Sequence, residues 1–86
     1  MFFTQDVFAT TNFSIAPNPT ANFIHIAIVN GFLDSIVLHD LEGKEILSEK
    51  IKDKQAIIDA RKLIVGIYFL KIISNRGAQT KIIIKM

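Results

Sequence analysis

The side chains that could do chemistry are not grouped in this sequence. Its only histidines are His25, which stands between two isoleucines, and His39, which stands beside Asp40. Metal and hydrolytic sites need three or four converging groups. Asp34 is close in sequence to His39 and Asp40, but residues 39 and 40 should point to opposite faces of one strand. We therefore interpret both histidines as ordinary surface or edge residues and predict no metal site.

Other catalytic patterns are also missing from the sequence. No serine stands in a nucleophile elbow, and no glycine-rich phosphate loop precedes a helix. No carboxylate pair at glycosidase spacing can be identified. The chain has no cysteine, which excludes a thiolate nucleophile, a thiolate metal site and a disulfide. We expect no catalytic residue, no cofactor and no enzymatic activity.

Charge and hydropathy exclude two classes of partner. The ten basic residues are scattered among eight acidic ones, and the net charge is only +2. A nucleic-acid groove needs clustered basic residues beside aromatic platforms, so we expect no nucleic-acid binding. No apolar run approaches the roughly 20 residues of a membrane-spanning helix. The start of the sequence as given lacks the basic residue and apolar core of an export signal, so we expect neither such a signal nor membrane insertion.

The elements that position any site should be strands. Half of the 86 residues are apolar, and isoleucine dominates among them, which favours a pleated sheet over a helix. Asn30-Gly31 and the glycines at 43 and 77 are turn signals. Residues 52–55 read as a charged loop, and residues 60–65 could form one helical turn before Gly66. The predicted strands are 13–15, 23–29, 34–40, 44–51, 56–59, 67–74 and 80–86.

This spacing predicts an all-β domain, a small seven-stranded immunoglobulin-like β-sandwich. Alternation in the sixth strand predicts that Tyr68 and its period-two partners point inward, with the Tyr68 hydroxyl bonded to a nearby carbonyl. In the last strand, alternation predicts Ile82 and Ile84 inward and Lys81 and Lys85 outward. A glycine directly before the sixth strand suggests a positive φ at Gly66. Residues 1–12 have no sustained period and read as a linker, so residues 13–86 form the domain.

Four segments, taken in order, resemble one family. Residues 13–20, Phe-Ser-Ile-Ala-Pro-Asn-Pro-Thr, are similar to the opening signature of type IX secretion C-terminal sorting domains of type A. Residues 38–47 match the central hairpin, residues 63–72 match the Leu-x-x-Gly-x-Tyr strand, and residues 81–85 resemble the basic and aliphatic end. The sorting-motif residues that this resemblance selects are Pro17, Asn18, Pro19, Gly43, Lys44, Gly66 and Tyr68.

The resemblance implies a function without catalysis. Such domains direct cargo proteins of Gram-negative bacteria from the periplasm through the outer-membrane type IX translocon. A sortase-like peptidase then cuts before the domain, and the cargo is secreted or stays on the cell surface. The N-terminal cargo domain is absent from this chain, so residues 1–12 are interpreted as a linker or cargo remnant and residues 13–86 as the sorting domain.

An exposed edge strand offers a physical means of recognition, because unpaired backbone groups can accept a partner strand. The candidate docking segment is the last predicted strand and its end: Lys81, Ile82, Ile83, Ile84, Lys85 and Met86. The alternative is that its lysines only protect the edge from aggregation. An open edge also allows a weak edge-strand dimer.

The rival function is an immunoglobulin-like accessory or carbohydrate-binding module of a secreted enzyme or adhesin. A sugar-binding face would need exposed aromatic side chains, for which only Phe32 and Phe69 are candidates. Binding on a glycan array or affinity gel would favour this reading over the sorting domain.

Overall fold

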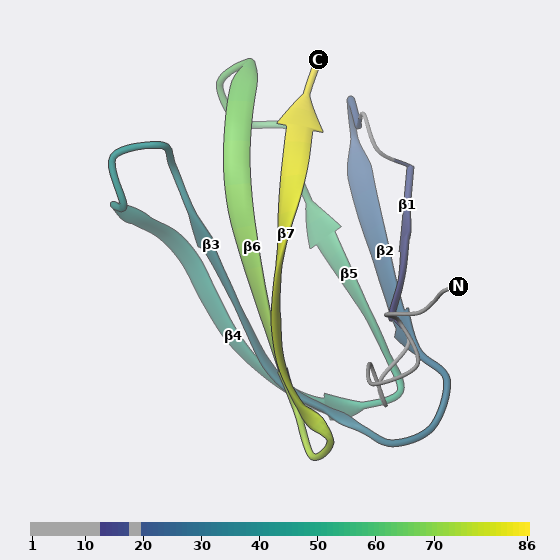
Figure 1. Ribbon diagram of the computed structural model, residues 1–86. Coiled ribbons are helices and arrows are strands. Elements are labelled where there is room, and N and C mark those ends of the chain that lie inside the picture. The colour runs from purple at the N-terminus through teal and green to yellow at the C-terminus, as the bar shows by residue number, and fades with distance from the viewer. Residues whose placement is uncertain (1–12, 18–19) are drawn as a thin grey trace, which may run out of the picture.

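The computed structural model describes residues 13–17 and 20–86, and within that part of the chain every regular element is a strand (Figure 1). The expectation of an all-β domain is therefore confirmed. The strands are β1 (Phe13–Ala16), β2 (Phe23–Ile28), β3 (Leu33–His39), β4 (Glu45–Asp53), β5 (Gln55–Asp59), β6 (Gly66–Ser74) and β7 (Gly77–Lys85).

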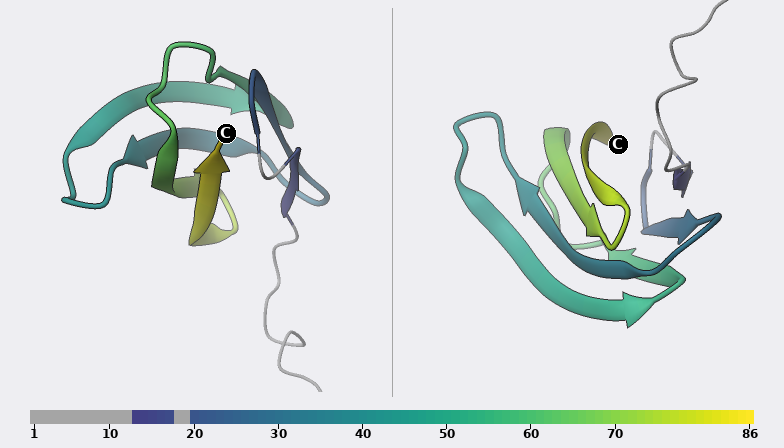
Figure 2. Two further views of the ribbon diagram at one scale, coloured as in Figure 1. Left: turned by 90° about the horizontal axis from the view of Figure 1, so that it is seen from above. Right: turned by 60° about the horizontal axis from the view of Figure 1, so that its bottom comes forward.

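The seven strands form two antiparallel sheets that face each other as a sandwich (Figure 2). One sheet has three strands in the order β1-β2-β5, and the other has four in the order β4-β3-β6-β7. Each strand runs opposite to the one before it in sequence. The connections therefore alternate between the two ends of the sandwich.

The core is built from the period-two pattern of the central strands. β2 contributes Ile24, Ile26 and Ile28, and these pack against β3, β6 and one residue of β7. In β6, Tyr68, Leu70 and Ile72 are buried as predicted. Each large apolar side chain buried in this way stabilises the fold by roughly 1.5–3 kcal/mol. With no disulfide available, this aliphatic packing carries the fold.

The predicted facing of the last strand is wrong. Ile82 and Ile84 are 57% and 42% exposed, whereas Ile83 is fully buried and Lys85 is only 8% exposed. The reason is the pairing register, which places Ile83 opposite the buried Tyr68. Directly opposed residues share one face of a sheet. Three consecutive isoleucines do not indicate which of them face the core, so the facing of β7 is determined by its pairing with β6.

Two predicted connections also differ in the structure. Residues 52–55 are not a loop, because β4 continues to Asp53 and only Lys54 separates it from β5. Lys52 has a positive φ of 54° and lies where the β3–β4 register shifts, so a bulge in β4 absorbs the change of direction. Residues 60–65 form no helical turn. There the Leu63 amide donates to the Ala60 carbonyl at 3.1 Å in a tight turn.

The β3–β4 hairpin was predicted correctly. Its turn is closed by Asp40, whose Oδ1 accepts hydrogen bonds from the backbone amides of Glu42 and Lys44, both at 2.9 Å. Gly43 has a φ of +86°, which is the left-handed region that glycine adopts without a steric penalty. The positive φ expected at Gly66 is also present, at +156°.

We expect Gly43→Val to lower the free energy of unfolding by about 1–2 kcal/mol, the cost of holding a residue with a Cβ in the left-handed region. Gly66→Val should cost less, because its φ lies close to the extended region. Nothing lies within 4 Å of an added Cβ at either position, so both losses report backbone strain alone. Urea denaturation measures both losses in unfolding free energy. A loss for Gly66→Val that equals or exceeds the loss for Gly43→Val would contradict this prediction.

An ion pair anchors the loop that follows β5. The Arg61 guanidinium donates two hydrogen bonds to the Asp59 carboxylate, at 2.9 Å and 2.8 Å. The side-chain hydrogen bond from Arg61, followed by the bond from the Arg61 amide, lowers the pKa of Asp59 from 3.8 to about 2. Arg61 also lies 5.0 Å from the centroid of the Phe23 ring, so the loop is held against the three-stranded sheet.

The Asp59–Arg61 ion pair should affect how the stability of the domain depends on pH. Because the pKa of Asp59 is lowered by folding, its contribution is present above about pH 4 and is lost as the pH falls towards 2. We expect Asp59→Asn to remove part of the stability loss in that interval. Denaturation of both proteins from neutral pH to pH 2 tests this, with Asp34→Asn as the control on an exposed carboxylate of β3. Equal curves for the two variants would contradict the prediction.

Candidate recognition surface

The segments singled out in the sequence meet at one end of the sandwich. Because the strands alternate in direction, the β1–β2 connection, the β3–β4 turn, the β5–β6 loop and the end of β7 all lie at the same end (Figure 1). We call this the motif end, comprising Pro17, Thr20 and residues 40–44, 60–68 and 84–86. Asn18 and Pro19 lie outside the described residues, as does the linker predicted over residues 1–12.

Thr20 joins two of these segments directly. Its amide donates to the Ile84 carbonyl at 2.8 Å, and its carbonyl accepts from the Met86 amide at 2.7 Å. These two bonds make a parallel bridge between Thr20 and Lys85. The Thr20 side chain is buried, and its hydroxyl donates to the Phe23 carbonyl at 2.9 Å. Thr20 thus ties the end of β7 to the opposite sheet.

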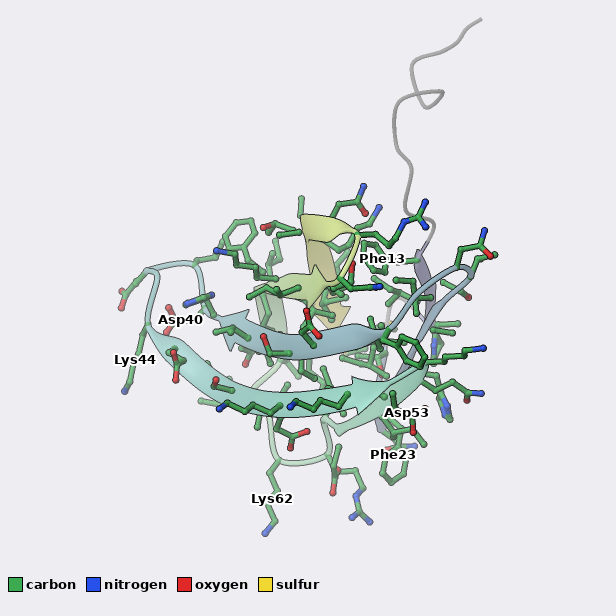
Figure 3. All side chains as sticks on the ribbon, turned by 90° about the horizontal axis from the view of Figure 1, so that it is seen from below. Phe13, Phe23, Asp40, Lys44, Asp53 and Lys62 are labelled. Carbon is green, nitrogen blue, oxygen red and sulfur yellow. The ribbon has the colours of Figure 1, made fainter. Side chains whose placement is uncertain are left out.

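Two further segments share a shallow depression. It has a volume of about 360 Å³ and lies between the β3–β4 turn and the start of β6. Two of its lining residues, Asp40 and Glu42, are acidic, and the remaining lining is largely apolar. The lining residues are Asp40, Leu41, Glu42, Ile64, Val65, Gly66, Ile67 and Tyr68. Figure 3 shows Asp40 and Lys44 together at this tip of the hairpin, away from Asp53 at its other end.

Tyr68 holds the β5–β6 loop over the core. Its ring is buried, and its hydroxyl donates to the carbonyl of Ile64 at 2.5 Å. The predicted hydrogen bond is therefore confirmed. The arrangement is like the tyrosine corner of immunoglobulin domains, in which a hydroxyl bonds to backbone a few residues upstream. It keeps Ile64 and Val65 projecting into solvent, where both are exposed.

Exposed apolar side chains gather at the motif end. Leu41, Ile64 and Val65 are exposed in its loops, and Ile67, Ile84 and Met86 are exposed at the start of β6 and the end of β7. Ile67 and Ile84 are directly opposed across the β6–β7 pair. Contiguous exposed apolar surface on a small domain marks an interaction site. The candidate residues chosen from the sequence did not include Thr20, Leu41, Ile64, Val65 or Ile67, although all five lie within the motif segments.

The structure divides the candidate docking segment between the two faces of β7. Ile83 belongs to the core, Lys85 is buried, and Lys81 is half-buried. The Lys85 ammonium reaches the carbonyl oxygen of Met86 at 3.1 Å. Ile82, Ile84 and Met86 are exposed. Only the last three therefore offer apolar side chains to a partner.

The other side chains considered in the sequence lie apart from this surface or from one another. His25 is exposed on β2 and His39 is half-buried at the end of β3. No cluster of three potential metal-binding side chains occurs within residues 13–17 and 20–86. Phe32 lies in the β2–β3 connection, at the opposite end from the motif end, whereas Phe69 is half-buried on β6. The two do not form a common aromatic platform.

The described part of the chain contains no helix long and apolar enough to cross a membrane.

Comparison with known proteins identifies the family. Residues 14–86 match the model of the secretion system C-terminal sorting domain, which is nearly the whole chain and includes the four motif segments except Phe13. A search of curated proteins finds no match. On this evidence the chain belongs to the C-terminal sorting domain family of type IX secretion, whose members mark cargo for export by that machinery.

Proposed function

We propose that this domain is the sorting signal of a cargo protein and that the outer-membrane type IX translocon binds it at the motif end. In this proposal the cargo passes through the periplasm, and a sortase-like peptidase cuts within or before residues 1–12. The cargo is then secreted or retained at the cell surface. The domain itself catalyses nothing, and it supplies a folded surface to the machinery that moves it.

The meeting of the four motif segments at one end is the observation that carries this proposal. Each segment comes from a different part of the chain, and the antiparallel topology brings them together. Thr20, which precedes β2, is bonded to the end of β7, and Tyr68 ties the β5–β6 loop to the core. A surface assembled in this way exists only in the folded domain. Recognition would therefore depend on folding as well as on sequence.

The sorting-motif residues take two roles in this proposal. Pro17, Gly43, Gly66 and Tyr68 shape the turns, and we propose the same role for Asn18 and Pro19. Lys44 and the exposed apolar side chains of the motif end provide the contacts. In the docking segment, Ile82, Ile84 and Met86 would touch the translocon, while Ile83 and the stems of Lys81 and Lys85 support the strand from the inner face.

We expect two variants to lose export while keeping the fold. Ile64→Ser with Val65→Ser alters the β5–β6 loop, and Ile82→Ser with Ile84→Ser alters the outer face of β7. All four side chains are exposed, so the core stays intact. Each variant is fused behind a passenger with a general export signal, and the passenger in the medium or on the surface of a type IX-competent host is measured. We expect each to fall at least tenfold.

The matched control is Val29→Ser with Phe32→Ser, which removes two exposed apolar side chains at the opposite end of the sandwich. Its export should equal that of the unaltered fusion, and thermal melting should confirm that all three variants are folded. Normal export by both the β5–β6 loop variant and the β7 variant would place recognition on another surface. Failure of the unaltered fusion to leave the periplasm would overturn the sorting function of this chain.

A further inference from the structure

The edge of β5 presents a row of unpaired backbone groups. The Ile28 amide donates to the Lys54 carbonyl at 3.0 Å, and the Ala60 amide donates to the Asn22 carbonyl at 2.7 Å. Hydrogen-bonded pairs alternate along an antiparallel ladder, so the even-numbered residues of this stretch bond to β2. The amides and carbonyls of Gln55, Ile57 and Asp59 therefore point away from the sheet. Among the described residues they have no backbone partner.

The other three edges carry features that oppose strand addition. The end of β7 is already bridged to Thr20. β1 has only four residues and runs into Pro17, which has no N–H. β4 carries five charged side chains and a bulge at Lys52. Charges, prolines and bulges are the usual protections of edge strands. β5 has none of these between Gln55 and Ile58, and Ile57 is more than half exposed on it.

We propose that the β5 edge pairs with the β5 edge of a second copy of this chain, antiparallel and centred on Ile57. In this register Ile57 faces the second copy's Ile57, and their outward amides and carbonyls form a reciprocal pair of hydrogen bonds. Gln55 faces the second copy's Asp59 and bonds in the same way. The two three-stranded sheets then become one continuous six-stranded sheet.

The side chains of this stretch are complementary to themselves. About the centre at Ile57, Ala56 faces the second copy's Ile58 on the core side of the sheet, so a small residue meets a large one. Farther from the centre, Lys54 faces the second copy's Ala60, and Asp53 lies towards the second copy's Arg61. No charge in residues 53–61 meets a like charge, which favours a second copy over an arbitrary strand as the occupant. Because the edge is short, the dimer should bury well below the roughly 1,200 Å² of surface that is typical of stable interfaces. We therefore expect it to be weak.

Sedimentation equilibrium of the whole chain tests this pairing. We expect the average mass to rise from 9.7 kDa towards twice that value between micromolar and millimolar concentration. Ile57→Lys places two ammonium groups opposite each other at the centre, on a side chain that is exposed in the monomer. It should weaken association at least tenfold. Ile46→Lys makes the same change at an exposed position on the β4 edge and should associate like the unaltered chain.

Amide hydrogen exchange followed by NMR tests the register. Raising the concentration should slow exchange at Gln55, Ile57 and Asp59 and leave Ala56 and Ile58 unchanged, since these two already bond to β2. A chain that stays monomeric at millimolar concentration would overturn the proposal. So would association that survives Ile57→Lys or that leaves exchange at the three odd-numbered amides unaltered. The dimer does not depend on the sorting function, and the export assay reports on that function separately.

Discussion

The register of β6 against its two neighbours is the constraint on which the rest of the structure depends. β6 pairs with β3 on one side and with β7 on the other, so it fixes the facing of three strands at once. With Tyr68, Leu70 and Ile72 directed inward, Ile36 and Leu38 of β3 must face the same core. A shift of the pairing by one residue would turn the buried side chains of β3 and β6 towards solvent. In a domain without disulfides, losing those rows would remove most of the core.

The same register produces the surface proposed for recognition. It buries Ile83 behind Tyr68 and leaves Ile84 on the outer face beside Ile67. The Tyr68 hydroxyl, fixed by the burial of its ring, then holds the loop that carries Ile64 and Val65. The core and the motif end are therefore built by the same strand. Core substitutions in β6 should disturb recognition even where they touch no partner.

The edge strands of this small sandwich differ in how open they are to association. Three of its edges carry a bridge, a proline or a charged and bulged strand, each of which opposes uncontrolled pairing. Exposed apolar side chains gather at the motif end, and Ile57 is exposed on the β5 edge. The motif end consists of loops and an outer face, where a partner would bind through side chains. The β5 edge offers unpaired backbone amides and carbonyls, which bind another strand.

Much of this protein could be predicted from sequence because its signals are local. Alternation located all seven strands, the turn signal at Gly43 located the β3–β4 hairpin, and the order of four motifs identified the family. The facing of β7 could not be predicted, since three consecutive isoleucines fit either face and only the pairing with β6 distinguishes them. The bridge from Thr20 to the end of β7 joins residues more than sixty positions apart, and no local pattern reports such a contact. The convergence of the motifs at one end is likewise a property of the antiparallel topology, because the direction of each strand follows from how the sheets pair.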